Sequence, residues 1–273
     1  FWLDQMKEIE NLPPPITKSK NEEHYYYKNG LKYVYPYFKH LQTYAKGRWE
    51  QREIGEVFEK EFRNYTKQII NENIKEGKVT INGSRIKDAT YIIKPKDLIE
   101  YTQHRHENPV CDYEVHIIYL DKDLMVVNKP PTIPVHPRGN YHKNSLTEML
   151  KYEYNQPNAL IVHRLDRLTS GCLLFARHKK AASKFSSLIQ KKAFQKVYIC
   201  LVQGKLELSR LHVVKTNIVI KMYGVGQMQN CPYEGTEGKP AVTHLIGFAH
   251  VDVDGKEHTY VMAAPITGRN HQI

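Results

Sequence analysis

The chain has 273 residues, of which 41% are hydrophobic and 25% charged, and its net charge at neutral pH is +11. This length and balance are typical of a globular protein with one large or two modest domains. No apolar run reaches the ~18 residues that a membrane span needs, and residues 1–20 lack the apolar core of a signal peptide. We therefore expect no membrane-spanning helix and no role within a membrane.

The positive charge favours a polyanionic partner, and nucleic acid is the commonest one. A lysine-rich, solvated surface would give the same charge, so the charge alone leaves both interpretations open. The cysteines are scattered, without a C-x-x-C pair or a zinc-type spacing with histidine. We therefore expect a reducing compartment and neither a disulfide framework nor a zinc site.

An N-terminal extension, residues 1–43, precedes a small module over residues 44–101. The expected elements of this module are helices over 54–62 and 69–74, a strand at 79–81, an Asn82-Gly83 turn and a strand at 94–101. Two helices followed by short strands suit a small RNA-binding module, and they suit any other small α+β domain equally well. Residues 102–112 are polar and contain a proline, so they are expected to be a linker.

Residues 113–273 are predicted to form a second domain in which strands dominate. Two apolar runs joined by a short polar turn predict a hairpin over 116–129. The other expected elements are strands at 159–163, 172–176, 197–202, 241–248 and 259–264 and an amphipathic helix over 178–192. The pattern in residues 205–240 predicts no particular element. The sequence as a whole thus predicts an α+β protein with a mixed, mostly antiparallel sheet.

The stretch from 163 to 205 contains ten lysines and arginines and a single acid, Asp166. A phosphate backbone would bind such a surface by counterion release. The surrounding positive charge favours the ionised form of the Asp166 carboxylate. Two interpretations of Asp166 stay open at this point: it braces Arg164 or Arg167 or caps a turn, or it is ionised because it reacts.

Several enzyme classes are excluded by missing motifs. The HRLD of 163–166 differs from the kinase loop H-R-D, and there is no D-F-G. No phosphate-binding G-x-x-x-x-G-K-[ST], metalloprotease H-E-x-x-H or hydrolase G-x-S-x-G occurs, and the histidines show no metal-ligand spacing. We therefore expect a protein without cofactor or metal.

The stretch IVHRLDRLTSGCLLFA resembles the H-R-L-D-x-x-T-S-G signature of the RluA-type RNA pseudouridine synthases. Other matches occur in the family's order, in LMVVNKPPTIPVHP, KVYICLVQG, GKPAVTHL and TGRNHQI. The resemblance covers 113–273 and implies a catalytic domain there. Residues 44–101 are similar to the ribosomal S-four type of RNA-binding domain, and PYFKHLQTYAKGRWEQ resembles the eukaryotic branch. The family's chain continues past H-Q-[IL]-R, so this catalytic domain is expected to be C-terminally incomplete.

The resemblance implies a redox-neutral isomerisation of uridine within RNA, without cofactor. It implies that Asp166 is the nucleophile, that Arg269 pairs with it and that Tyr198 stacks on the base. Arg164 matches a residue that enters the RNA stack, and Arg167, Lys196 and His163 are expected to bind RNA. Residues expected to shape the site are Asn128, Lys129, Thr169, Gly171, His271 and Gln272.

The expected partner is RNA, with transfer RNA ahead of messenger and ribosomal RNA, and the expected state is a monomer. The expected compartment is intracellular, cytoplasmic or nuclear, with mitochondria left open. One alternative is a catalytically silent RNA-binding protein that uses the same basic face. Another is the synthase part of an enzyme fused to a riboflavin-pathway deaminase, although no H-x-E…P-C-x-x-C signature is present.

Overall fold

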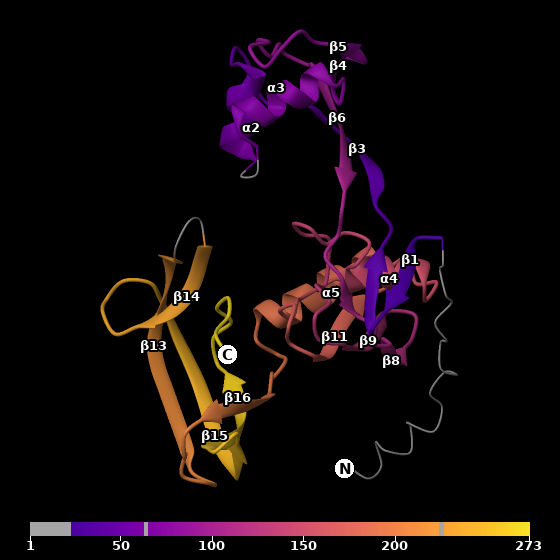
Figure 1. Ribbon diagram of the computed structural model, residues 1–273. Coiled ribbons are helices and arrows are strands. Elements are labelled where there is room, and N and C mark those ends of the chain that lie inside the picture. The colour runs from indigo at the N-terminus through magenta and orange to yellow at the C-terminus, as the bar shows by residue number, and fades with distance from the viewer. Residues whose placement is uncertain (1–22, 63–64, 224–226) are drawn as a thin grey trace. The chain divides into compact units, whose positions relative to one another are not determined.

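The computed structural model describes residues 23–62, 65–223 and 227–273 (Figure 1). The three prolines at 13–15 lie outside these residues. The chain divides into two compact units. The first unit contains the described residues up to Ala159 together with Arg167–Phe175, and the second contains Leu160–Asp166 and Ala176–Ile273. The two units are described separately.

The first unit contains strands that belong to three sheets, together with helices. Its elements, in chain order, are β1 (Tyr25–Lys28), β2 (Leu31–Val34), β3 (Tyr37–Tyr44), the 3-10 turn η2 (Gly47–Trp49), α2 (Ile54–Glu61), α3 (Lys67–Lys75), β4 (Val79–Ile81), β5 (Ser84–Arg85), β6 (Leu98–Arg105), β7 (Val110–Cys111), β8 (His116–Leu120), β9 (Leu124–Lys129), α4 (Leu146–Tyr152) and β11 (Gly171–Ala176).

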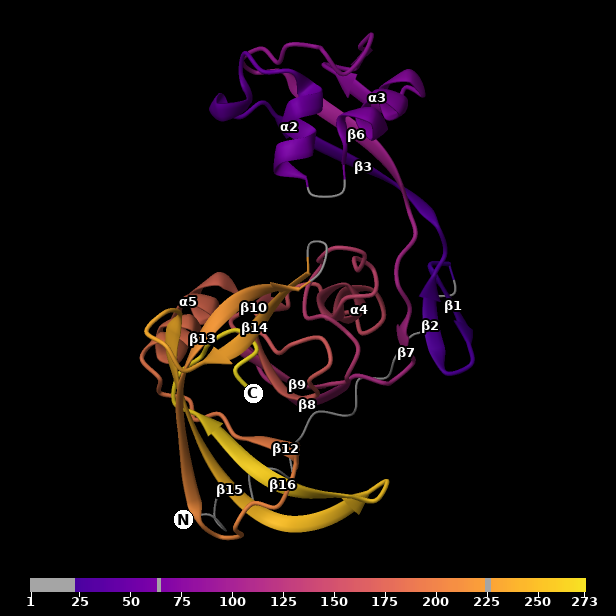
Figure 2. The same ribbon diagram turned by 60° about the vertical axis from the view of Figure 1, so that its left-hand side comes forward.

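Helices α2 and α3 and the sheet β3-β6-β4-β5 enclose one apolar core (Figure 2). Fully buried Ile54, Ile70 and Ile93 occupy its centre, because the apolar positions of both helices recur at helical spacing. Asn82 and Gly83 both have positive φ, 52° and 76°, as a tight hairpin turn requires. The two helices, the strand at 79–81 and the turn predicted here are confirmed.

Strand β6 lies further along the chain than the strand predicted at 94–101, because it begins at Leu98 and ends at Arg105. It continues through Thr102–Arg105, and β7 follows at Val110–Cys111, so both fall in the segment expected to be a linker. Strand β6 reaches Arg105 because β3, which the sequence did not predict, supplies a partner along its whole length, from Tyr44 opposite Leu98 to Tyr37 opposite Arg105. A long antiparallel pairing therefore replaces the expected irregular segment.

The described end of the N-terminal extension packs into the first unit. Strands β1, β2 and β7 form a sheet, and Tyr25 on β1 is 1% exposed. The ammonium of Lys32 on β2 pairs with the carboxylate of Glu153, next to the end of α4, and both side chains are almost fully buried. The same ammonium lies 3.9 Å from the centre of the Tyr25 ring.

The predicted hairpin over 116–129 is confirmed as β8 and β9, which pair antiparallel. Strand β9 also pairs with β11. The inward positions of β9, β11 and α4 are almost fully inaccessible to solvent, as the alternating apolar pattern requires. These buried side chains are Met125, Val127, Leu146, Leu150, Leu173 and Phe175.

The second unit is dominated by one antiparallel sheet in the order β12-β16-β15-β13-β14. Its elements are β10 (Leu160–Ile161), α5 (Lys179–Gln190), β12 (Tyr198–Gln203), β13 (Leu211–Tyr223), β14 (Gln227–Tyr233), β15 (Lys239–Val253) and β16 (Lys256–Pro265). The His178 side chain caps α5 by accepting a hydrogen bond of 3.2 Å from the Ala181 backbone N–H. Among the described residues, no helix has the length and apolar character that crossing a membrane requires.

The predicted α+β class with mostly antiparallel sheets is confirmed. Residues 205–240, for which the sequence predicted no element, contain β13 and β14, and β13 pairs with β15 from Leu211 opposite Ile246 onward. The expected strand at 159–163 is shorter, because only Leu160–Ile161 has strand structure. Beyond Ile161 the chain follows an irregular path through the HRLD motif.

Candidate functional site

Asp166 lies in the irregular stretch after β10, and its side chain is 43% exposed. Its Oδ1 atom is 3.7 Å from Nε2 of His271 and 3.9 Å from Nη2 of Arg164. The fold thus brings two motifs from distant parts of the sequence, HRLD and TGRNHQ, next to each other in the second unit. A carboxylate that is partly exposed between two basic groups is available to a ligand that approaches from solvent.

The TGRNHQI segment is held against β15 by hydrogen bonds. The Gln272 amide nitrogen donates to the Val242 carbonyl and to the Thr243 hydroxyl, both at 3.0 Å. The Gln272 amide oxygen accepts from the Thr267 hydroxyl at 2.8 Å and from the Arg269 backbone N–H at 3.0 Å. Gln272 therefore closes the loop on itself and anchors it, which fixes the backbone next to His271.

Arg269 has a different partner from the one that the family resemblance implies. Its Nε donates a hydrogen bond of 2.9 Å to the carbonyl oxygen of Pro240. Within the described residues, the ion-pair partners of Asp166 are Arg164 and His271. A direct pairing of Arg269 with Asp166 therefore stays a prediction. Arg269 joins its loop to β15, and His271 is the residue of this loop that approaches the Asp166 carboxylate.

Tyr198 is the first residue of β12, where it lies opposite Ala263 of β16. Burial raises the pKa of its phenol, and the negative charge of Asp166 adds to the effect. The phenol therefore stays protonated at neutral pH and retains a hydrogen-bond donor. This state favours the predicted stacking role over a role as a base, and the influence of Asp166 indicates that the two side chains are near each other.

The imidazole of His163 is partly buried and lies within the electrostatic influence of Lys196. Burial and, to a lesser extent, the charge of Lys196 lower the pKa of the His163 imidazole to about 4. His163 is therefore neutral at physiological pH, so it has no charge with which to attract phosphate. Both residues belong to the second unit, as do Arg164, Asp166, Tyr198, Arg269, His271 and Gln272.

Lys129, at the end of β9, is fully buried in the first unit. Its ammonium donates hydrogen bonds to the carbonyls of Pro130 at 2.8 Å, Ile133 at 2.7 Å and Arg167 at 3.2 Å. One buried cation thus holds the proline-rich loop and the residue that follows Asp166 in the chain. This contact supports the predicted site-shaping role of Lys129.

The other site residues predicted in the first unit show less specific contacts. Gly171 has φ +118°, a conformation that L side chains rarely adopt, so the turn into β11 requires glycine. Asn128 is exposed and lies opposite His116 of β8, and Thr169 is half-buried.

The Arg167 guanidinium lies over the Tyr141 ring, 5.5 Å from its centre. Tyr141 was not among the predicted residues. The signal that could have indicated it is an aromatic residue directly after the basic turn sequence PRGN, because an arginine can pack over such a ring.

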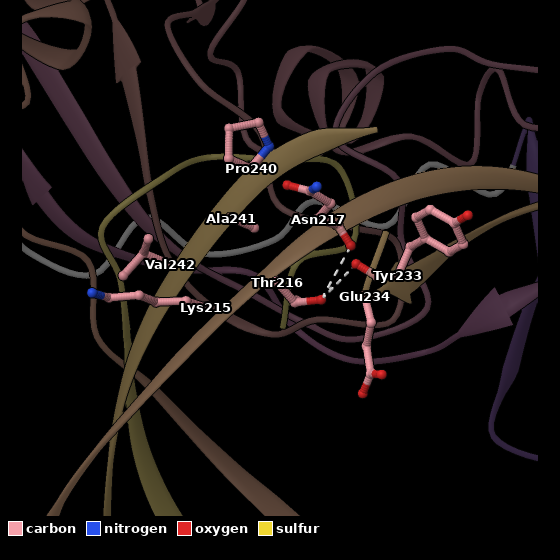
Figure 3. Close-up of a pocket in the computed structure, with 8 residues that line it drawn as sticks. All are labelled: Lys215, Thr216, Asn217, Tyr233, Glu234, Pro240, Ala241 and Val242. Carbon is pink, nitrogen blue, oxygen red and sulfur yellow. Dashed lines mark hydrogen bonds between the residues drawn. The ribbon is translucent and has the colours of Figure 1, made fainter. Parts of the chain in front are cut away.

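A hollow of about 450 Å³ lies where β13, β14 and β15 meet (Figure 3). At its wall the Thr216 hydroxyl donates to the backbone carbonyls of Asn217 at 3.3 Å and Tyr233 at 3.2 Å. Its lining also includes Pro240 and Val242, whose carbonyls accept the hydrogen bonds of Arg269 and Gln272. The predicted site residues themselves do not line it, so it lies beside the TGRNHQI anchor rather than at Asp166.

Comparison with known proteins identifies the class. A family model described as RNA pseudouridylate synthase matches residues 123–273, and an S4 domain model matches residues 64–99. The chain therefore belongs to the RNA pseudouridylate synthase family, and the resemblance to RluA-type enzymes of the eukaryotic branch is confirmed. The two matched segments contain, respectively, the HRLD and TGRNHQI motifs and the α3–β4 part of the small module.

Several curated proteins are similar over most of this chain. Pseudouridylate synthase RPUSD2 of Mus musculus is 34% identical over 92% of the chain and 44% of its own length. The tRNA pseudouridine(31) synthase of Saccharomyces cerevisiae is 30% identical over 91% of the chain and 69% of its own length. The mitochondrial tRNA pseudouridine(32) synthase of the same yeast is 33% identical over 89% and 51%. The chain thus spans about half the length of RPUSD2 and of the mitochondrial enzyme.

Proposed function

We propose that this protein is an RNA pseudouridine synthase in which Asp166 is the nucleophile. The reaction breaks the bond between uracil and ribose, turns the base and joins carbon 5 of the base to the sugar. A proton leaves carbon 5 and the detached ring nitrogen gains one, so the reaction is redox-neutral. The observation that supports the proposal best is the 3.7 Å approach of His271 in TGRNHQ to Asp166 in HRLD, which unites the two family motifs around one carboxylate.

The neighbouring side chains have roles that follow from their chemistry. Arg164 and His271 place basic groups beside the Asp166 carboxylate, at 3.9 and 3.7 Å. An ionised carboxylate is the reactive form of this nucleophile. Tyr198 keeps its proton and offers a ring on which the uracil stacks. A uridine within structured RNA must leave its stack to reach Asp166, at a cost of a few kcal/mol.

We propose transfer RNA as the substrate, with messenger and ribosomal RNA behind it. Two yeast relatives are named for pseudouridines at transfer RNA positions 31 and 32, and they are similar to at least 89% of this chain. The chain also has a net charge of +11, which suits a nucleic-acid substrate. We propose the cytoplasm or the nucleus as the compartment, with mitochondria as an alternative because one yeast relative is named for that organelle.

The decisive experiment measures the release of tritium from RNA that carries uridine labelled at carbon 5. We expect the purified protein to release tritium from bulk transfer RNA, and the Asp166→Asn variant to release none above background. The matched control is Asp254→Asn, which makes the same chemical change at an exposed turn between β15 and β16. Equal rates for wild type and Asp166→Asn would disprove the nucleophile.

A second measurement separates catalysis from binding. If the protein binds RNA but wild type releases no tritium from transfer, messenger or ribosomal RNA, the protein is the silent RNA-binding alternative. Pseudouridine maps of RNA from cells with and without the gene then identify the substrate. Sites that disappear only from transfer RNA would support the proposed substrate, and sites that disappear only from messenger or ribosomal RNA would contradict it.

A further inference from the structure

A tight turn in the first unit gathers arginines from three separate segments. Arg138 and Tyr141 exchange backbone hydrogen bonds of 2.8 and 3.1 Å, which closes the turn. The guanidinium of Arg105, at the end of β6, donates to the carbonyl of Gly139 in this turn at 2.5 Å. The guanidinium of Arg167 lies over the Tyr141 ring at 5.5 Å. We call Arg105, Arg138 and Arg167 the arginine turn cluster.

The carboxylates near this cluster do not form ion pairs with it in the described residues. Glu107 accepts hydrogen bonds from the backbone N–H groups of His142, Lys143 and Asn144. Burial raises the pKa of the Glu107 carboxyl, but these hydrogen bonds more than offset that effect and lower it. Glu107 is therefore ionised, and its carboxylate oxygens accept hydrogen bonds from the backbone that follows the turn.

Further positive charge lies beside the cluster. Burial lowers the pKa of Lys39, and the charge of Arg105 lowers it further, which indicates that the two bases are near each other. Glu107 and Glu148 act in the opposite direction on the pKa of Lys39, so two carboxylates partly offset this charge. Arg138 and Arg167 are exposed. The guanidinium groups of Arg105 and Arg167 lie against the turn to which Arg138 belongs, and none of the three arginines is paired with acid in the described residues. This arrangement is suited to bind phosphate.

We propose that the arginine turn cluster binds the phosphate backbone of the RNA substrate. This inference rests on the proposed function. Phosphate contacts of this kind fix the register of a nucleic acid without reading its sequence. The cluster therefore selects for a backbone path and not for particular bases.

The test measures binding of fluorescein-labelled oligouridylate and of bulk transfer RNA over a range of salt concentrations. The variants are Arg105→Gln, Arg138→Gln and Arg167→Gln. We expect each to weaken binding of both RNAs by about tenfold at physiological salt, as the loss of one charge-assisted hydrogen bond would. We expect each to reduce the salt slope for the single strand by about 0.7. Arg105→Lys, which keeps the charge, should retain that slope even if its contact with Gly139 is lost.

The control is Arg210→Gln, because Arg210 is 66% exposed and already pairs with Glu207 at 2.7 Å. It should leave both affinity and salt slope unchanged. Within the described residues the Arg138 side chain forms no hydrogen bond, ion pair or ring contact, so a folding defect would not explain the effect of Arg138→Gln. If wild type binds RNA and releases tritium while all three variants match it in slope and affinity, the cluster proposal is wrong and the proposed function stands. If wild type neither binds RNA nor releases tritium, both are wrong.

Discussion

Nε2 of His271 lies 3.7 Å from Oδ1 of Asp166, although the two residues belong to motifs far apart in the sequence. The His271 side chain is 64% exposed, so this ion pair is weak and exists only when the imidazole is protonated. An exposed pair of this kind contributes about 0.2–1 kcal/mol. Its catalytic value is therefore modest compared with that of the carboxylate itself.

We expect His271→Gln to reduce kcat/KM for tritium release by no more than about fivefold, because an exposed ion pair contributes at most about 1 kcal/mol. Asp166→Asn, in contrast, should abolish release. His116→Gln, a change at an exposed histidine on β8, serves as the control. A loss of a hundredfold or more in His271→Gln would mean that His271 acts directly on the substrate.

Lys129→Met should destabilise the protein strongly. The change leaves the carbonyls of Pro130, Ile133 and Arg167 without their buried donor, and each orphaned group costs about 1–3 kcal/mol. We expect the free energy of unfolding to fall by about 3 kcal/mol or more in urea titrations. Lys122→Met, at an exposed position before β9, should change it little. A shift of less than about 1 kcal/mol for Lys129→Met, within the range of ordinary substitutions, would contradict the role given to the ammonium.

His163 predicts a specific dependence of stability on pH. Its folded-state pKa of about 4 lies below the unfolded value of 6.5, so the unfolded state binds more protons between these values. The folded state is therefore not penalised above pH 6.5 and loses stability as the pH falls toward 4. The loss is at most about 3 kcal/mol for a shift of this size.

The measurement compares urea unfolding of wild type and His163→Asn at pH 7.5 and pH 4.5. The variant lacks the titrating group, so its stability should fall less between the two pH values than that of wild type. The same difference in both proteins would show that His163 does not cause the acid sensitivity.

The buried pair of Lys32 and Glu153 predicts a pattern among three variants. Either single change, Lys32→Met or Glu153→Leu, leaves one charge buried without its partner and should cost about 3–5 kcal/mol. The double variant removes both charges and should recover most of that stability. The free energies come from urea unfolding, combined in a double-mutant cycle. Additive losses in the double variant would show that the two side chains do not interact.

Much of the local structure could be predicted because it depends on neighbouring residues. The helical spacing around Ile54 and Ile70, the Asn82-Gly83 turn and the hairpin over 116–129 all appear where the patterns place them. Strands β1 to β3 and β13 could not be predicted in this way. Their stability comes from partners elsewhere in the chain, such as β6 for β3 and β15 for β13.

The sequence by itself determined the class of this protein and the residues around which its chemistry is proposed. Short motifs such as HRLD and TGRNHQ made this possible, because the chemistry of their residue types does not depend on the rest of the fold. Only the tertiary structure decided which of those residues meet. Gln272 anchors the TGRNHQI loop on β15, so that His271 approaches Asp166 while Arg269 binds the Pro240 carbonyl. The physical reason is that hydrogen bonds and ion pairs act over a few ångströms, and strand pairing sets which distant segments come that close.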